Sequence, residues 1–285
     1  MKVVLLKQGS AEWLEYRLKM RNASETAAVL GESPWMTPYQ LWLLKTGRAT
    51  TKTTAAMQHG TDMEPLARTA YEERYGNIMQ PVVLQEGLYS ASLDGMDLDG
   101  QLIVEIKCPF KGQSSELWTD AVFGRAPPYY MLQIQHQLMV SGAALAHLWV
   151  FDGVQGILVP VEHDPEAQDR IKRGWEAFQN YLDADVPPPL TDADSVFRDD
   201  PVWAGAAKAF AEAKRLSDVA DAELAKAREA LVGLARHPKE TGAGVIVTRY
   251  WKAGAIDYKR IPALKSILLE EFRGKAREEV RVSCQ

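Results

Sequence analysis

The residues with the clearest capacity for chemistry lie on the two sides of Asp99-Gly100, within the segment 92–109. Asp and Gly tolerate the positive φ angles of a type I′ turn, so this pair predicts a two-residue hairpin turn. A turn centred there places Asp94 opposite Glu105 and Ser92 opposite Lys107, with all four side chains on one face. Opposed Cβ atoms lie roughly 5 Å apart, so the two carboxylates repel unless a cation or a proton lies between them.

An acidic pair of this kind is typical of a site for a hard divalent cation. Carboxylate oxygens suit Mg²⁺ or Mn²⁺, and Lys107, two residues beyond Glu105, could orient or deprotonate a metal-bound water. Glu64 is a candidate third acidic group, although a carboxylate at a helix start is also explained by the helix dipole. The acidic pair is also compatible with a solvated hairpin face that carries a cross-strand ion pair.

The acidic pair needs a hairpin and surrounding elements to hold it. The apolar residues Leu102, Val104, Ile106 and Cys108 alternate along the chain, which predicts a strand with one apolar face. Residues 81–90 predict a strand leading into this hairpin, and a second hairpin is expected over 146–151 and 156–161. A helix is predicted over residues 10–20 with Ser10 as its N-cap, and another over 38–43 that Thr37-Pro38 opens. Apolar periodicity and end signals predict further helices over 24–30, 64–75, 129–140 and 164–182.

The helix predicted over 129–140 carries several glutamines. Gln133 and Gln137 lie one turn apart, whereas Gln135 faces elsewhere. A glutamine on a core-facing helix is costly unless it is hydrogen-bonded. At least one of these side chains is therefore expected to reach a polar site.

The N-terminal segment offers a candidate phosphate site. Residues 1–60 contain eight Lys and Arg residues against four Glu residues, although the whole chain carries a net charge of −5. Ser24 is positioned as the N-cap of a short helix, whose free N–H groups and dipole would attract a phosphate. Arg17 and Arg21 lie just upstream. Ser24 is equally well explained as a plain capping residue.

The last third of the chain has a different pattern. In the segment 203–234, nine of ten heptad a and d positions are apolar, which predicts a long helix that packs on another helix. A hairpin over 244–258 and a final helix over 263–279 are expected to follow. The proline run 187–189 and the acidic residues after it predict a linker. We therefore divide the chain into a core over residues 1–189 and an extension over residues 190–285 for packing or assembly.

Composition is ordinary for a soluble globular protein. Hydrophobic residues make up 46% of the chain and charged residues 25%. No apolar run approaches the ~20 residues of a membrane span, and the apolar run near the start is too short for a secretory signal. Cys108 and Cys284 form no zinc pattern, and Cys108 is expected to be a reduced core residue. These features predict a cytosolic (cytoplasmic) protein with no membrane partner.

The motifs, taken in order, resemble the phage lambda exonuclease or YqaJ-like viral recombinase family of PD-(D/E)xK nucleases. The resemblance covers roughly residues 9–182 and departs from the family at Leu93, where a Pro usually precedes the metal Asp. The segment 254–261 also resembles the tail of phage members. The motifs that carry the resemblance read EWLEYRLKMRNAS, GTDMEPLAR, SLDG, EIKCPF and LQIQHQL.

The resemblance implies a fold and an activity. The fold would be α/β (α+β), with a central mixed sheet flanked by helices, a restriction-endonuclease-like core and a helical C-terminal extension. The activity would be Mg²⁺-dependent 5′→3′ digestion of one strand of linear double-stranded DNA, which leaves 3′ single-stranded tails. It also implies a ring-shaped homotrimer and cooperation with a phage-type single-strand annealing protein in recombination.

The resemblance also suggests site roles. Asp94, Glu105 and the Ile106 carbonyl would bind Mg²⁺, or Mn²⁺ as a substitute, and Glu64 would serve a second ion. Lys107 would orient or activate the attacking water, with either Gln133 or Gln135 in support. The residues expected at the 5′-phosphate are Arg17, Ser24, Ser92 and Arg21. A structure-specific or restriction-type endonuclease, and a non-catalytic DNA-binding or assembly protein, remain as alternatives.

Overall fold

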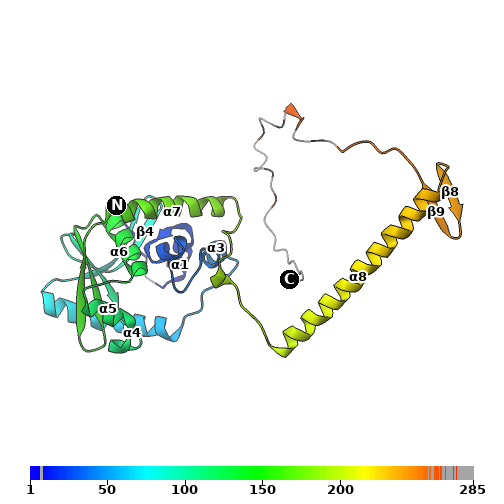
Figure 1. Cartoon of the computed structure of the whole chain (residues 1–285). Helices are drawn as coiled ribbons and strands as arrows, with labels where there is room; N and C mark the ends of the chain where they lie inside the picture. The colour runs from blue at the N-terminus through cyan, green and yellow to red at the C-terminus, as the bar shows by residue number, and fades with distance from the viewer. Residues whose placement is uncertain are drawn as a thin grey trace. The chain divides into compact units, whose positions relative to one another are not determined.

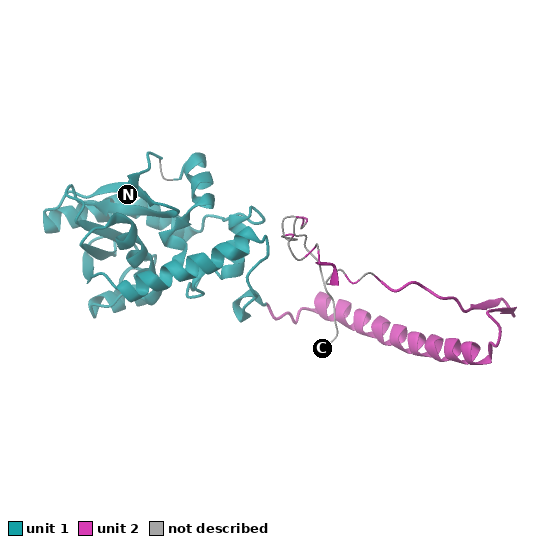
Figure 2. Ribbon diagram, turned by 90° about the horizontal axis from the view of Figure 1, so that it is seen from above, with its two compact units in different colours: residues 1–195 teal, residues 196–285 magenta. Residues whose placement is uncertain are grey.

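The computed structural model describes residues 1–6 and 9–255, together with residues 257, 260–262, 264, 267, 272 and 274. The chain divides into two compact units, Met1–Ser195 and Val196–Gln285 (Figure 2). The border expected after residue 189 therefore lies inside the first unit.

The first unit is built on a seven-stranded mixed sheet (Figure 1). Strands β5 and β6 are parallel, as are the short β2 and β4, and the other neighbours are antiparallel. The predicted mixed sheet flanked by helices is therefore confirmed. The strands lie in the order β1 (Lys2–Val3), β3 (Gln80–Glu86), β4 (Tyr89–Met96), β5 (Leu102–Lys107), β6 (Leu145–Phe151) and β7 (Gly156–Val161), with β2 (Arg21–Asn22) beside β4.

Capping residues begin several helices as the sequence predicted. Oγ of Ser10 accepts from the main-chain N of Trp13, and Thr37 and Gln40 form a capping box. The helices of this unit are α1 (Ala11–Lys19), α2 (Thr26–Val29), α3 (Pro38–Lys45), α4 (Ala55–Tyr75), α5 (Glu116–Val122), α6 (Pro128–Ser141) and α7 (Pro165–Asp183). Three 3₁₀ turns complete the unit: η1 (Ala23–Glu25), η2 (Gly112–Ser114) and η3 (Asp192–Asp194).

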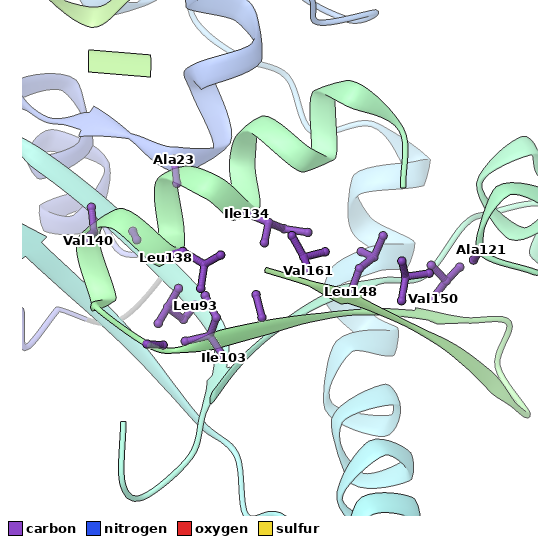
Figure 3. Close-up of a cluster of buried hydrophobic side chains, with 14 of the residues drawn as sticks. Ala23, Leu93, Ile103, Ala121, Ile134, Leu138, Val140, Leu148, Val150 and Val161 are labelled. Carbon is purple, nitrogen blue, oxygen red and sulfur yellow. The ribbon is translucent and has the colours of Figure 1, made fainter. Parts of the chain in front are cut away.

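Helices cover both faces of the sheet. On one face, Ile134 and Leu138 of α6 pack against strand residues that include Ile103 and Leu148 (Figure 3). On the other face, Ala67 and Tyr71 of α4 pack against Val104 and Ile106, with Cys108 partly buried beside them. The predicted apolar face of β5 is therefore confirmed, and it is the face that carries α4.

Two of the predicted elements have different bounds in the structure. Helix α4 begins at Ala55 behind the N-cap Thr54, so Pro65 is interior and Glu64 is not at a helix start. Pro65 has no N–H to donate to the Thr61 carbonyl, and Thr61 is exposed, so water can supply the missing donor. Residues 81–90 hold parts of two strands, because the chain turns at Gly87, whose φ is +57°.

The predicted helix over 24–30 is also different. It is split into η1 and the four-residue α2, and Ser24 lies inside η1. Ser24 therefore caps no helix. The helix N-terminus that was expected to hold a phosphate is not formed there.

The second unit contains α8 (Pro201–Leu234) and a hairpin of β8 (Lys239–Gly242) and β9 (Val245–Thr248). The long helix is confirmed, and the hairpin lies earlier than the predicted 244–258. No residue of α8 is buried in the structure. The predicted final helix over 263–279 lies largely outside the described residues, as does part of the segment 254–261, and Cys284 lies outside them.

Among the described residues, no helix is both long and apolar enough to cross a membrane.

Candidate active site

The β4–β5 hairpin has the predicted register but a different turn. Gly95 pairs with Val104 and Met96 with Ile103, as a turn centred at 99–100 requires. The main-chain N of Asp97 donates to the carbonyl of Leu102 (3.0 Å), which leaves a four-residue loop over 98–101. Oδ1 of Asp97 accepts hydrogen bonds from the main-chain N–H groups of Gln101, in this loop, and Leu102, at the start of β5. The predicted two-residue type I′ turn is therefore wrong, and of the expected pair only Gly100 has a positive φ.

Strand β4 contains a bulge at the first acidic residue. Val82 pairs with Leu93 and Gln80 with Met96, so two steps along β3 match three along β4. The extra residue lies at Asp94-Gly95. A Cβ on Gly95 would lie 2.7 Å from both Met79 Cβ and Val104 Cγ1, so this position requires glycine. Bulges redirect side chains and are common beside active sites.

The two strands part at Asp94. Their described pairing ends at Gly95 and Val104. Beyond it, the main-chain N of Ile106 donates to Oδ2 of Asp94 (2.8 Å) instead of to a strand carbonyl. Nε of Arg68, on α4, donates to the main-chain O of Asp94 (2.7 Å). The bulge and the fork therefore fix Asp94 from two sides.

The sequence predicted that Ser92 shares one face of the hairpin with Glu105, and in the structure it does not. Ala91 and Leu93 pack in the α6 cluster, so alternation places Ser90 and Ser92 on the opposite face of β4. Glu105, in contrast, contacts α6. The bulge is the reason, because an extra residue shifts the alternation between Ser92 and the paired part of the hairpin.

Glu105 is held in one orientation. It is 2% exposed. Its Oε1 accepts from Nε2 of Gln133 (2.6 Å), and its Oε2 accepts from Nε2 of Gln137 (2.5 Å). The ammonium group of Lys107 forms an ion pair with the same carboxylate. Both carboxylate oxygens thus have fixed donors from α6.

The structure distinguishes among the α6 glutamines. Gln135 lies away from Glu105: its Nε2 donates to the Glu162 carbonyl (2.7 Å), and its Oε1 accepts from the main-chain N of Asp164 (2.9 Å). Gln135 therefore supports the start of α7, and the suggested role for it at the site does not fit. Gln137 was not proposed for the site, although its one-turn spacing from Gln133 was the signal that could have found it.

Three carboxylates and two cations form what we call the acidic cluster: Glu64, Arg68, Asp94, Glu105 and Lys107. Arg68 pairs with Glu64, and Lys107 pairs with Glu105. Burial, and then the charge of Glu105, raises the pKa of Asp94 well above its usual value. Burial also raises the pKa of Glu64, against the opposing effect of Arg68. When every group is ionised, the cluster carries an excess of one negative charge.

The donor chemistry of the acidic cluster fits a hard divalent cation. Asp94 and Glu105 supply carboxylate oxygens, and Oε1 of the neighbouring Gln137 is buried without a hydrogen-bond partner. Mg²⁺ is commonly held by one or two carboxylates, and waters and substrate phosphates complete its shell. Among the described residues, no three His, Cys, Asp or Glu side chains are already arranged as a metal site. A bound ion would therefore rely on such added oxygens.

Lys107 is a cation in this environment. Burial alone lowers the pKa of an amine, but the adjacent Glu105 outweighs it and raises the pKa of Lys107 above its usual value. Nζ of Lys107 lies 4.9 Å from the centre of the Tyr130 ring. A protonated amine donates hydrogen bonds and cannot accept a proton. In this arrangement Lys107 can donate hydrogen bonds to a water or a phosphate.

A second charged group, which we call the N-terminal network, consists of Arg17, Ser24, Glu25 and Lys45. Nη2 of Arg17 donates to Oγ of Ser24 (3.0 Å) and Oε1 of Glu25 (3.1 Å). Nζ of Lys45 lies 2.6 Å from Oε2 of Glu25, and the Lys45 side chain is 3% exposed. Burial, opposed by Glu25, lowers the pKa of Lys45. The structure thus brings Arg17 and Ser24 together, with Glu25 between the two cations.

The other two predicted phosphate residues lie near α1. Nη1 of Arg21 donates to the hydroxyl of Tyr89 (3.0 Å), while its Nε is buried without a partner. Ser92 shares a face of β4 with Ser90, and Oγ of Ser90 accepts from the hydroxyl of Tyr16 (3.0 Å). Ser92 therefore lies on the side of β4 that contacts α1, the helix that carries Arg17.

Comparison with known proteins identifies relatives of this chain. Residues 12–144 match the model of the YqaJ-like viral recombinase domain. Over 179 residues the chain is 28% identical to the uncharacterized protein YqaJ of Bacillus subtilis (strain 168). The aligned region covers 59% of this chain and 55% of that protein. The chain thus spans about half the length of this curated relative.

Solved structures share the fold. The alkaline exonuclease LHK-Exo from Laribacter hongkongensis aligns with a TM-score of 0.52 and 27% identity, over 62% of this chain and 94% of that chain. The structure of LHK-Exo in complex with dAMP gives the same values. These matches confirm the resemblance inferred from the motifs and the restriction-endonuclease-like core.

Proposed function

We propose that the chain is a Mg²⁺-dependent deoxyribonuclease of the alkaline exonuclease type. It would digest one strand of linear double-stranded DNA from the 5′ end and leave 3′ single-stranded tails. The observation that carries the proposal is the Asp94–Glu105 pair at the fork of β4 and β5, with Lys107 ion-paired beside it. The similarity to LHK-Exo supports the same activity.

The acidic cluster would supply the metal ligands. Asp94, Glu105 and the main-chain carbonyl of Ile106 would hold one ion, Glu64 would serve a second, and Mn²⁺ would substitute for Mg²⁺. Two bound ions would stabilise the attacking and leaving oxygens of an in-line displacement.

The protein's own groups would position the reactants. Gln133 and Gln137 hold both oxygens of Glu105, so this carboxylate cannot rotate away. Lys107 would donate hydrogen bonds to the attacking water or the scissile phosphate and offset developing negative charge. At the strand end, Arg17, Ser24, Arg21 and Ser92 would bind the 5′-phosphate. The N–H groups of Arg17 already point toward Ser24, which makes a charge-assisted contact possible there.

Assembly and partners extend the proposal. A ring-shaped homotrimer would enclose linear DNA, and a phage-type single-strand annealing protein would take up the 3′ tail. The protein would act in the cytoplasm of a bacterial or phage-infected cell. The family resemblance supports these three statements.

Digestion of end-labelled DNA tests the proposed activity. A linear duplex is labelled at the 5′ end of either strand and incubated with the full chain, with and without Mg²⁺. We expect the label to be released as mononucleotide only with Mg²⁺, while a covalently closed plasmid stays intact. Cleavage of the closed plasmid would instead indicate an endonuclease. No Mg²⁺-dependent cleavage of either substrate would indicate a DNA-binding or assembly protein.

A further inference from the structure

Three aromatic rings border the acidic cluster on the α6 side. Trp35 lies between α2 and α3, and its ring centre is 4.9 Å from that of Tyr129 and 5.8 Å from that of Tyr130. The two tyrosines lie in the first turn of α6, 4.5 Å apart. Tyr130 is also the ring that contacts Nζ of Lys107. The rings therefore form a continuous path from Lys107 to the surface.

The outer end of this path is open to solvent. Trp35 is 66% exposed, whereas Tyr129 and Tyr130 are partly buried and held by α6. Among the described residues of segment 26–46 and of α6, Trp35 is the one large apolar side chain that is exposed. A stable protein–protein interface needs about 800 Å² from each partner. A single exposed ring on a fixed aromatic base suits a small flat ligand better.

The charge next to the rings narrows the choice of ligand. Lys107 is a fixed cation at one end of the path, and Trp35 offers a flat apolar surface at the other. A nucleotide joins a flat aromatic base to an anionic phosphate, so it matches both ends. Bases stack on aromatic side chains with little dependence on sequence, as an enzyme that passes along any DNA requires.

We propose that Trp35, Tyr129 and Tyr130 form a stacking platform for an unpaired nucleobase whose phosphate faces Lys107. The inference rests on the proposed function, because it assigns the base side of the same substrate. The platform would receive a base as it leaves the duplex and would hold the attached backbone beside the acidic cluster.

Binding without cleavage tests the platform separately from hydrolysis. The full chain is titrated in EDTA into a duplex with unpaired 5′-terminal nucleotides that include 2-aminopurine, whose fluorescence falls on stacking. We expect wild type to quench the signal and Trp35→Ala to lose the quenching and bind about tenfold more weakly. Trp35→Phe should keep most of the affinity, because it retains a ring.

Phe123→Ala is the matched control. Phe123 is 68% exposed in the same unit and contacts Arg125 instead of the platform. Its substitution should leave binding unchanged, and thermal unfolding checks that each variant is folded. Wild-type affinity and quenching in Trp35→Ala would overturn the proposal. So would an equal loss in Phe123→Ala, or a Trp35→Phe variant as weak as Trp35→Ala.

Digestion distinguishes the two proposals. If wild type fails to cleave DNA with Mg²⁺ but still quenches 2-aminopurine through Trp35, the nuclease proposal fails and the platform stands. If wild type cleaves DNA and Trp35→Ala matches it in both KM and quenching, only the platform fails.

Discussion

The acidic cluster and the N-terminal network use the same residue types in opposite proportions. The acidic cluster holds three carboxylates and two cations, whereas the N-terminal network holds two cations around Glu25. Each has an excess of one charge, with opposite sign. A partly buried excess charge is stabilised by a ligand of the opposite sign. We therefore propose a divalent cation as the ligand of the acidic cluster and a phosphate as the ligand of the N-terminal network.

The two groups also differ in what holds them together. In the N-terminal network the charges attract, and Glu25 ties α1 to α3 through Arg17 and Lys45. In the acidic cluster the carboxylates repel, and neutral donors from α6 together with the strand fork keep Asp94 and Glu105 in place. The N-terminal network therefore stabilises the fold, whereas the fold holds the acidic cluster together.

Removing a charge from the acidic pair should have the largest effect on activity. Asp94→Asn or Glu105→Gln should lower the cleavage rate at least about a thousandfold, since a lost metal ligand removes several kcal/mol of transition-state stabilisation. DNA binding should change little, because the proposed 5′-phosphate contacts of Arg17 and Ser24 lie outside the acidic cluster. Quantitative digestion and a binding assay measure the two effects. Cleavage above a tenth of the wild-type rate in both variants would contradict this assignment.

Loss of Lys107 from the acidic cluster should have the second-largest effect on the cleavage rate. Lys107→Ala should lower the rate on the order of 10²-fold, as expected for a positioned electrostatic group. Metal affinity should be retained, since the carboxylates remain. If calorimetry instead shows that the variant no longer binds Mn²⁺, Lys107 serves to build the site and not to act on substrate.

Without metal, removing a carboxylate charge should change the free energy of unfolding in opposite directions in the two groups. Glu25→Gln should lower the free energy of unfolding by about 3 kcal/mol, because it leaves buried Lys45 without its counter-charge. Asp94→Asn should raise it at neutral pH. The pKa of Asp94 is raised by folding, so the folded state binds this proton more tightly than the unfolded state does. Ionisation of Asp94 therefore opposes folding.

Denaturant unfolding in EDTA measures both changes. Wild-type stability should fall as pH rises from the ordinary Asp pKa through the raised pKa of Asp94, and this contribution should be absent in Asp94→Asn. A shift of the two variants in the same direction would remove the contrast on which the comparison depends.

The N-terminal network should set the preference for the strand end. Substrate with a 5′-phosphate should be digested about tenfold faster than 5′-hydroxyl substrate, in line with one charge-assisted hydrogen bond. Arg17→Ala should erase this difference. Equal rates of wild-type enzyme on both ends would show that the network does not bind the phosphate.

Removal of the second unit should have the smallest effect on chemistry. Truncation after Ser195 leaves both charged groups intact, so single-turnover cleavage should stay near the wild-type rate. The apolar heptad positions of α8 would be lost, together with any assembly that they support. Light scattering coupled to size exclusion should give a trimer for the full chain and a smaller mass for the truncated one. A monomeric full chain would refute the ring.

The sequence predicted those features that depend on neighbours in the chain. The Gly95–Val104 register follows from the hairpin centre, and the Ser10 and Thr37 caps follow from their side chains. The alternation along β5 likewise predicted which residues reach the α4 face. Local chemistry decides each of these, so local sequence was sufficient.

The features that the sequence did not predict depend on contacts between residues that lie far apart in the chain. The bulge at Asp94 is set by pairing with β3 and by the contact of Gly95 with Met79. The choice of Gln137 over Gln135 depends on where Glu105 and α7 lie. Pro65 predicted a helix start because proline fits best in the first turn of a helix, whereas α4 accommodates it internally.

Calorimetric titration with Mn²⁺ tests the central claim most directly. Wild type, Glu105→Gln and Asp97→Asn are compared as full chains. Asp97 lies at the other end of the same hairpin, where its carboxylate accepts main-chain N–H bonds, so it is the matched control. We predict that wild type and Asp97→Asn bind Mn²⁺ alike and that Glu105→Gln loses binding. Undiminished Mn²⁺ binding by Glu105→Gln would contradict the assignment of a metal to the acidic cluster.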